Sequence, residues 1–194
     1  MSKILLLCSG LRHTSHYVQP FLKRLEVYLG SKCDCLDVRN AVTFDERTFF
    51  EYDQVIFIFT TAMNTIPSST LEIFQKLETQ IKKETEIYAL IGCDEYEPEK
   101  CNLSEKILEK WCEKEGLIYK GALKVGSVLF IMNGSSKYIV SNYIKNFSLS
   151  VIKHEYVHLQ ISMLSDKIFM KKANQYWNKE IHKKQKEKAA HHLF

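Results

Sequence analysis

The sequence predicts an α/β protein with a doubly wound, five-stranded parallel sheet of order 2-1-3-4-5 and helices on both faces. Short apolar runs recur near residues 4–7, 55–59 and 87–91, and the second run is apolar on both faces, as in a central parallel strand. Each run ends in a polar loop, and each loop leads into a segment with helical periodicity. A chain of 194 residues is long enough for one such domain with a sizeable core.

The first strand, at residues 4–7, leads through the segment CSGLRHTSHY into a helical pattern. The apolar positions of that pattern are Val18, Phe21, Leu22, Leu25 and Leu29. Small and hydroxyl-bearing residues fill the turn, and Arg12 adds a cation. Because a helix N-terminus offers unpaired N–H groups and a partial positive charge, this turn is suited to holding a phosphate.

The phosphate loop matches neither of two common motifs. It lacks G-x-x-x-x-G-K-[ST], which excludes an NTPase phosphate loop, and G-x-G-x-x-G, which excludes the dinucleotide fingerprint. A hydroxyl-rich loop after the first strand suggests instead a mononucleotide such as FMN. The structural alternative is that Ser9, Thr14 and Ser15 only turn the chain and cap the helix.

The other strands and helices are expected to alternate along the chain. We predict strands at residues 33–38, 52–61, 87–92 and within 116–131, and helices at about 71–81, 103–112, 137–158 and 168–188. Pro67, Ser68 and Ser69 stand at the start of the first of these helices, where proline and hydroxyl residues are favoured. The loops after the first, third and fourth strands leave carboxyl ends of the sheet. They are therefore expected to converge on one ligand-binding crevice.

Residues 1–194 are predicted to form a single domain, with residues 160–194 as a helical, lysine-rich extension of it. Residues 167–194 hold eight Lys and two Glu, a net charge of +6, which leaves −2 of the total +4 for the remaining 166 residues. Such a tail can bind nucleic acid or a membrane surface, or it can be a solvated helix face. We expect the solvated face, with no nucleic-acid and no membrane partner. A packed helix face is predicted from the spacing of Phe169, Ala173, Tyr176, Trp177 and Ile181.

The cysteines indicate a reducing, cytoplasmic setting with free thiols. The six Cys show none of the paired spacings of a zinc site, and neither a signal-peptide layout nor a membrane-length apolar run is present. Cys33 and Cys35 share one strand face, which fits two small core residues better than a metal site. Cys8 lies beside a helix start, where a thiol pKa is lowered, so it is either redox-active or a buried small residue.

Two further polar groups have a functional and a structural interpretation. His13 and His16 could share a helix face, but a phosphate contact or simple exposure explains two histidines better than a metal does. Four carboxylates follow the fourth strand and could bind a cation or form a solvated loop: Asp94, Glu95, Glu97 and Glu99. We expect no metal site.

Four segments together resemble the NAD(P)H-dependent FMN reductase branch of the flavodoxin-like superfamily. They are residues 3–15 (KILLLCSGLRHTS), 52–77, 87–126 and 169–184 (FMKKANQYWNKEIHKK). The resemblance implies that the first loop wraps the FMN phosphate, the second contacts the isoalloxazine ring through its backbone, and Tyr96 of the third is available for stacking. The first loop would contribute Ser9, Arg12, Thr14 and Ser15, and the second Thr61, Ala62, Met63, Asn64 and Thr65.

The resemblance also implies an activity. It predicts an FMN-dependent oxidoreductase that uses NAD(P)H as co-substrate, passes electrons to a small acceptor such as a quinone, a nitro compound or a flavin, and forms a homodimer. The transfer of electrons from NAD(P)H through the flavin to the acceptor needs no acid or base from the protein, so no catalytic residue is assigned. The second loop lacks the family's aromatic residue and glycine. The alternative is therefore a flavodoxin-like binding or regulatory module with a degenerate FMN site.

Overall fold

The sheet has six parallel strands, in the order β2-β1-β3-β4-β5-β6. The computed structural model describes residues 3–9, 15–37, 49–132 and 136–191, with the side chains at 15–16 and 186–191 left out. The strands are β1 (Ile4–Cys8), β2 (Cys33–Asp37), β3 (Gln54–Thr60), β4 (Glu86–Gly92), β5 (Ile118–Val125) and β6 (Val157–Ile161). The parallel α/β sheet predicted from the alternating pattern is thereby confirmed, apart from its sixth strand.

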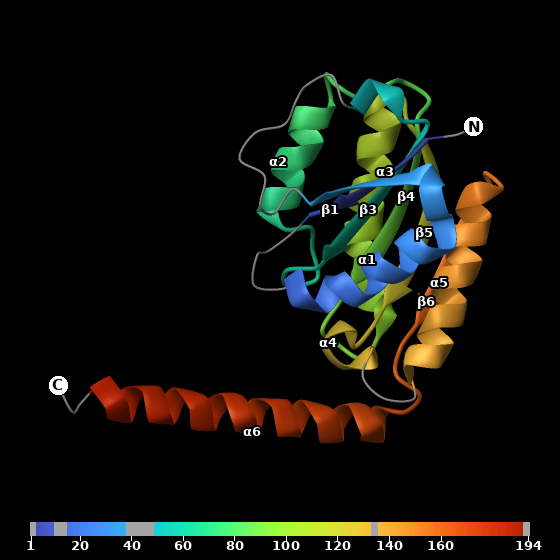
Figure 1. Ribbon diagram of the computed structural model, residues 1–194. Helices are drawn as coiled ribbons and strands as arrows, with labels where there is room; N and C mark the ends of the chain where they lie inside the picture. Colours follow the sequence, from blue (N-terminus) through green and yellow to red (C-terminus); the bar gives the residue numbers. More distant parts are fainter. Residues whose placement is uncertain (1–2, 10–14, 38–48, 133–135, 192–194) are drawn as a thin grey trace.

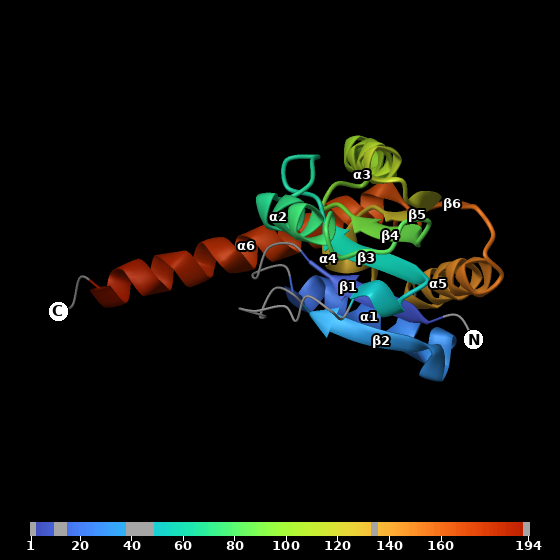
Figure 2. The ribbon, with the colours of Figure 1, turned by 90° about the horizontal axis from the view of Figure 1, so that it is seen from above.

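Helices cover both faces of the sheet. They are α1 (Ser15–Leu29), α2 (Ser68–Leu77), α3 (Asn102–Glu115), α4 (Val128–Ile131), α5 (Ser136–Ile152) and α6 (Asp166–His191), with short 3₁₀ turns η2 (Gly30–Lys32), η3 (Phe49–Glu51) and η4 (Pro98–Cys101). Figures 1 and 2 show α1 and α5 on one face, and α2 and α3 on the other. This is the doubly wound arrangement expected of successive right-handed crossovers.

Each face of the sheet has its own apolar core. On the α1–α5 side, Phe21 and Leu25 of α1 and Phe147 of α5 are fully buried in one cluster with alternate strand residues. On the other side, the rings of Phe74 in α2 and Trp111 in α3 stack with centroids 4.5 Å apart. All seven residues of β3 are buried, as predicted for a central strand that both layers cover.

The prediction of five strands was wrong because a sixth follows α5. The helix expected at residues 137–158 ends at Ile152, and the chain turns through His154, whose φ is +60°. Val157, Leu159 and Ile161 then face the α1–α5 core at every second position, while β6 pairs with β5. Three alternating apolar residues are too few to predict a strand when they directly follow the long helical pattern of α5. The region expected as strand at 116–131 likewise divides into β5 and the short helix α4.

The C-terminal segment is a helix, as predicted, but only part of its apolar face is packed. Phe169, Ala173 and Tyr176 lie against the α1–α5 core, whereas Trp177 is 59% exposed and Ile181 51% exposed. Figures 1 and 2 show the rest of α6 projecting beyond the body of the domain. Within the ranges described, no helix combines the length and the apolar composition needed to cross a bilayer.

Candidate functional site

The candidate site lies at the carboxyl edge of the sheet, where β1, β3 and β4 end side by side. Cys8 of β1 is level with Ile58, and Thr60 of β3 is level with Gly92 of β4. The strand order reverses between β1 and β3, because the chain continues from β1 to β2 on one side and then to β3 on the other. Ligands of doubly wound sheets bind at this kind of switch point.

Ser9, the first residue of the predicted phosphate loop, lies in the floor of the site. It is 1% exposed, its N–H donates to the carbonyl of Ile58 at 2.9 Å, and its Oγ accepts from Thr70 Oγ1 at 3.1 Å. Its hydroxyl thus joins the end of β1 to the first turn of α2. Ser15 is the first residue of α1, while Arg12 and Thr14 lie outside the described residues. The phosphate contacts of this loop therefore remain a prediction.

The second predicted loop, residues 61–65, folds into a tight turn of its own. Ala62 and Thr65 exchange backbone hydrogen bonds of 2.8 and 3.0 Å, and the two residues between them, Met63 and Asn64, have φ values of 50° and 63°. Two successive positive φ values are the signature of a type I′ turn. Thr61 N–H donates to the carbonyl of Gly92 at 2.8 Å. Three of the five amides proposed for the flavin ring are therefore already used within the protein.

Two buried side-chain oxygens, one in this turn and one in α2, have no hydrogen-bond partner in the part of the chain that the structure describes. They are Asn64 Oδ1 in the turn and Ser69 Oγ in the first turn of α2. A buried acceptor without a partner costs about 1–3 kcal/mol, and a water molecule or a ligand usually satisfies it. These atoms fit a bound molecule with hydrogen-bond donors. FMN offers such a donor in its ring, so the second loop can accommodate this cofactor.

The third loop, between β4 and η4, is held by the residues that follow β5 and β6. Ser127 N–H donates to the carbonyl of Glu95 at 2.6 Å, and the hydroxyl of Ser162 donates to the carbonyl of Tyr96. The ring of Tyr96 lies against Phe169 of α6, with centroids 5.7 Å apart. The ring that the sequence suggested for stacking on a flavin is thus already packed against the C-terminal helix.

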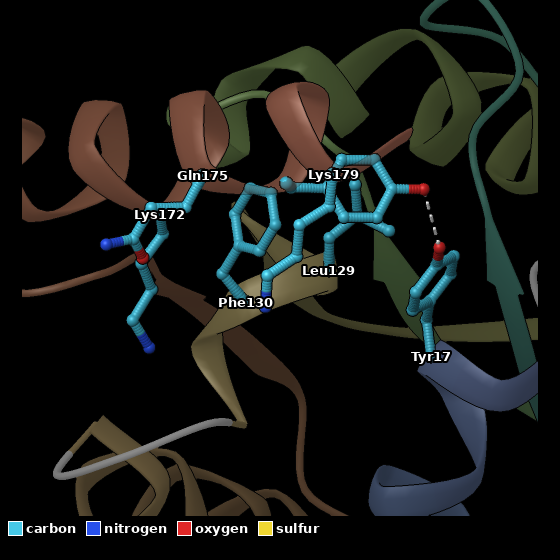
Figure 3. A pocket seen from close by; sticks show the side chains of 7 residues that line it. Tyr17, Leu129, Phe130, Lys172, Gln175 and Lys179 are labelled. Carbon is cyan, nitrogen blue, oxygen red and sulfur yellow. Dashed lines mark hydrogen bonds between the residues drawn. The ribbon is translucent and has the colours of Figure 1, made fainter. Parts of the chain in front are cut away.

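Two adjoining hollows lie where α6 crosses α4 and the start of α1. The larger has a volume of about 370 Å³ and is lined by Tyr17, Leu129, Phe130, Lys172, Gln175, Tyr176 and Lys179. In Figure 3, Lys172 and Gln175 of α6 lie at one end of the hollow and Tyr17 at the other, with Phe130 and Leu129 between them. The smaller, of about 200 Å³, also reaches Asp94 and Trp177. The α6 helix therefore borders the third loop of the candidate site.

Tyr17 and Tyr176 connect the beginning and the end of the chain across these hollows. Their hydroxyl groups are 3.3 Å apart, and Figure 3 draws this hydrogen bond. Burial, together with the hydrogen bond to Tyr176, raises the pKa of Tyr17 well above its ordinary value. Tyr17 is therefore a neutral hydrogen-bonding group near pH 7. Sequence reasoning had assigned Tyr176 to a packed face but had no signal for its partner.

The cysteines and acidic residues do not form a metal centre in the described part of the chain. No group of three His, Cys, Asp or Glu there is placed to hold an ion. Cys8 is fully buried, which favours its structural interpretation. Cys35 is exposed and Cys33 half-buried on the edge strand β2, so the expectation that both are core residues was wrong. Cys33 still packs against the α1–α5 core, whereas Cys35, on the same edge strand, is left to solvent.

Comparisons with known proteins agree with this architecture. No protein-family model and no curated protein matches the sequence. Among solved structures, flavodoxin 1 from Bacillus cereus matches with a TM-score of 0.60 at 14% identity, covering 79% of this chain and 99% of its own. The NAD(P)H:(acceptor) oxidoreductase FerB from Paracoccus denitrificans matches with a TM-score of 0.59 at 8% identity, covering 79% of this chain and 96% of its own. A flavodoxin from Fusobacterium nucleatum bound to flavin mononucleotide matches with a TM-score of 0.56 at 12% identity, covering 80% of this chain and 99% of its own.

The chain is an α/β protein of the doubly wound class, and its fold is flavodoxin-like. At these identities the similarity concerns the fold. The function has to be argued from the residues at the carboxyl edge.

Proposed function

We propose that this protein is an FMN-dependent oxidoreductase that takes electrons from NAD(P)H and passes them to a small acceptor such as a quinone, a nitro compound or a free flavin. The observation that carries the proposal is that β1, β3 and β4 end side by side at the β1/β3 switch point, and that Asn64 Oδ1, in the loop after β3, has no hydrogen-bond partner among the described residues. Two solved structures of this fold, a flavodoxin bound to flavin mononucleotide and an NAD(P)H:(acceptor) oxidoreductase, support it.

The proposal gives each loop a role. Arg12, Thr14 and Ser15 hold the phosphate at the start of α1, above the buried hydroxyl of Ser9. The central amides of the type I′ turn, at Met63 and Asn64, together with Asn64 Oδ1, contact the polar edge of the ring. FMN, when bound, accepts a hydride from the nicotinamide and releases electrons to the acceptor. The protein only orients the ring and keeps one of its faces accessible.

The same proposal includes a cytoplasmic location and a homodimer. The six cysteines without a disulfide suit a reducing compartment. A site at the edge of the domain, bordered by a projecting helix, suits completion by a second subunit.

A binding or regulatory module without flavin is the second candidate, and two observations favour it. The amides of Thr61, Ala62 and Thr65 are already used, and the ring of Tyr96 is packed against Phe169. In such a module, the backbone groups of the second loop bond to one another and to β4 instead of to a flavin. The third loop packs against α6 through Tyr96.

An FMN titration followed by an NAD(P)H oxidation assay separates the two candidates. We expect the fluorescence of FMN to be quenched to saturation and NAD(P)H oxidation to depend on FMN. Saturating FMN without quenching or turnover would contradict the oxidoreductase and leave the binding module.

Matched variants test the assigned contacts. Arg12→Ala should weaken FMN binding by about 1–3 kcal/mol, the scale of a charge-assisted hydrogen bond. Asn64→Ala should also weaken it, whereas Met63→Ala, at a side chain that is 98% exposed, should leave FMN affinity unchanged. Equal affinities of the Asn64 and Met63 variants would remove Asn64 from the site.

A further inference from the structure

The larger of the two hollows beside α6 takes no part in the contacts assigned to FMN. It is bounded by the start of α1, by α4 and by α6, and none of the described residues that line it belongs to the three loops of the carboxyl edge. Its volume of about 370 Å³ lies within the range of roughly 300–1,000 Å³ that is typical of small-ligand sites. The hollow is therefore large enough for a small molecule of its own.

Three aromatic rings from distant parts of the chain line this hollow. They belong to Tyr17 of α1, Phe130 of α4 and Tyr176 of α6. Phe130 is 7% exposed, and its ring centroid lies 5.8 Å from that of Tyr176. The hydroxyl groups of the two tyrosines are 3.3 Å apart, which fixes the rings relative to each other. Walls of this kind favour a planar aromatic guest, because aromatic rings stack or meet edge to face.

The polar lining of the hollow comes from one face of α6. Lys172, Gln175, Tyr176 and Lys179 follow the spacing i, i+3, i+4, i+7, so all four side chains point to the same side of the helix. The two lysines are two helical turns apart, about 10 Å along the axis. In Figure 3, Lys172 and Gln175 lie at the end of the hollow opposite Tyr17. The hollow is thus bordered by two cations and an amide.

The charge around the hollow is not balanced by acidic groups in its lining. Among the described residues that line the larger hollow there is no carboxylate, whereas Asp94 lines the smaller one. Burial holds the pKa of Tyr17 above its ordinary value, so this phenol stays neutral and does not repel an anion. The electrostatic complement of the larger hollow is therefore a negatively charged group.

We infer that this hollow is a binding site for a small planar aromatic anion, such as an aromatic carboxylate or sulfonate. The ring of the ligand lies against Phe130 and Tyr176, and its anionic group reaches the ammonium groups of Lys172 and Lys179. The aliphatic stems of these lysines cover the ring while their charged ends meet the anion. An uncharged apolar guest would desolvate the ammonium groups without compensation. The site goes beyond the proposed activity, because its contacts need no flavin.

Isothermal titration calorimetry of the full chain, without FMN, tests the site with three probes. We expect 1-naphthoate to bind at a single site in the micromolar range. The neutral analogue 1-naphthamide should bind at least about tenfold more weakly, because it makes no charge-assisted contact with the lysines. Cyclohexanecarboxylate, an anion with a non-planar aliphatic ring, should also bind more weakly, because it cannot stack on the aromatic walls.

Paired lysine variants locate the binding. Lys172→Gln with Lys179→Gln should raise the Kd of 1-naphthoate by at least about tenfold. Lys172→Arg with Lys179→Arg keeps both charges and should retain most of the affinity. Lys171→Gln with Lys183→Gln is the matched control, since it removes two exposed lysines of the same helix that line neither hollow, and it should leave the Kd unchanged. Circular dichroism checks that each variant is folded.

Four results would overturn the proposal. They are no binding of 1-naphthoate up to millimolar concentration, equal affinity for 1-naphthamide, equal weakening by the control pair, and displacement of 1-naphthoate by FMN. The third would mean that the probe responds only to the overall charge of α6, and the fourth that the hollow is part of the cofactor site. A protein that binds no FMN can still bind 1-naphthoate, so the site and the proposed activity can fail separately.

Discussion

At the scale of single residues, Lys124 carries a charge into the interior beside β5. Its side chain is 2% exposed, and its Nζ lies 2.6 Å from Glu105 Oε2 and 2.8 Å from Asn102 Oδ1, both on α3. Tyr119 donates a further hydrogen bond of 3.0 Å to Glu105. Since a buried ion pair costs desolvation energy on both sides, its stability depends on these additional partners.

Removing only Lys124 from the Lys124–Glu105 ion pair should destabilise the domain far more than replacing both residues. We expect Lys124→Met to lower the free energy of unfolding by about 3–5 kcal/mol, because it leaves the Glu105 carboxylate without its cation. The double variant Lys124→Met, Glu105→Leu should recover most of that loss. Urea unfolding measures both, and a double variant no more stable than the single one would show that the pair itself stabilises the domain.

Glu86 anchors the opposite, amino-terminal edge of the sheet. Its carboxylate accepts hydrogen bonds from Gln54 Nε2 and His154 Nδ1, both at 2.8 Å, and lies 3.2 Å from Lys120 Nζ. Burial raises its pKa, but the hydrogen bonds from Gln54, His154 and Lys120 together outweigh burial and hold the pKa below the ordinary value of 4.5.

The lowered pKa of Glu86 predicts that part of the free energy of unfolding is lost in acid. A carboxyl whose pKa is depressed in the native state contributes stability above the unfolded-state pKa, and this is lost as the pH falls through the native pKa. The stability difference between wild type and Glu86→Gln should therefore be constant near neutrality and shrink below a pH of about 4.5. Urea unfolding at a series of pH values measures it. Glu113→Gln, at an exposed surface pair, is the control, and a difference independent of pH would reject the assignment.

At the scale of secondary-structure elements, the pairing of β6 with β5 depends on one glycine. Gly121 has a φ of +102°, and a Cβ placed there would meet the backbone carbonyl of Val157, its partner in β6. An L-residue at this position is therefore opposed both by its own backbone and by the neighbouring strand.

Gly121→Ala should detach β6 without unfolding the rest of the sheet. We expect faster hydrogen exchange throughout β6 and a loss of about 1–3 kcal/mol, the cost of a strained backbone position. Gly116→Ala provides the control, because Gly116 has a φ of +70° but nothing within 4 Å of an added Cβ. Exchange that rises equally in both variants would show that backbone strain alone, not the contact with Val157, is responsible.

At the scale of the whole molecule, α6 is both a cover for the domain and its most extended part. Phe169 packs against Tyr96 and Phe130, and Tyr176 lies 5.8 Å from Phe130 between ring centroids. These contacts join the end of the chain to the third loop and to α4. The first half of the helix therefore belongs to the folded unit rather than to a free tail.

Truncation after Asp166 should consequently lower the melting temperature. The loss of two half-buried rings corresponds to about 1–3 kcal/mol, and each kcal/mol shifts the midpoint of a domain of this size by about 2–4 °C. Differential scanning calorimetry of both chains, with truncation after residue 182 as the control, measures the effect. If the shorter truncation destabilises as much as the longer one, the stability comes from the projecting half instead.

The amino-acid sequence by itself determined the parallel sheet, apart from β6, and most of its helices. The apolar runs of β1, β3 and β4 are the signature of strands covered on both faces, and the period of α1, α2 and α3 marks one buried side of each. These patterns are local, because a residue's own neighbours in sequence show which of its faces must leave water. The carboxyl-edge position of the three polar loops follows from the same alternation.

Only the tertiary structure decided which segments meet across the fold. The Tyr17–Tyr176 hydrogen bond joins residues 159 apart, and β6 exists as a strand because β5 offers it an edge. The type I′ turn has only a weak local signal, because Asn64 suits a positive φ but Met63 does not. Such features depend on contacts between distant parts of the chain. Their free energy is set by the partner that the fold supplies and does not appear in either segment alone.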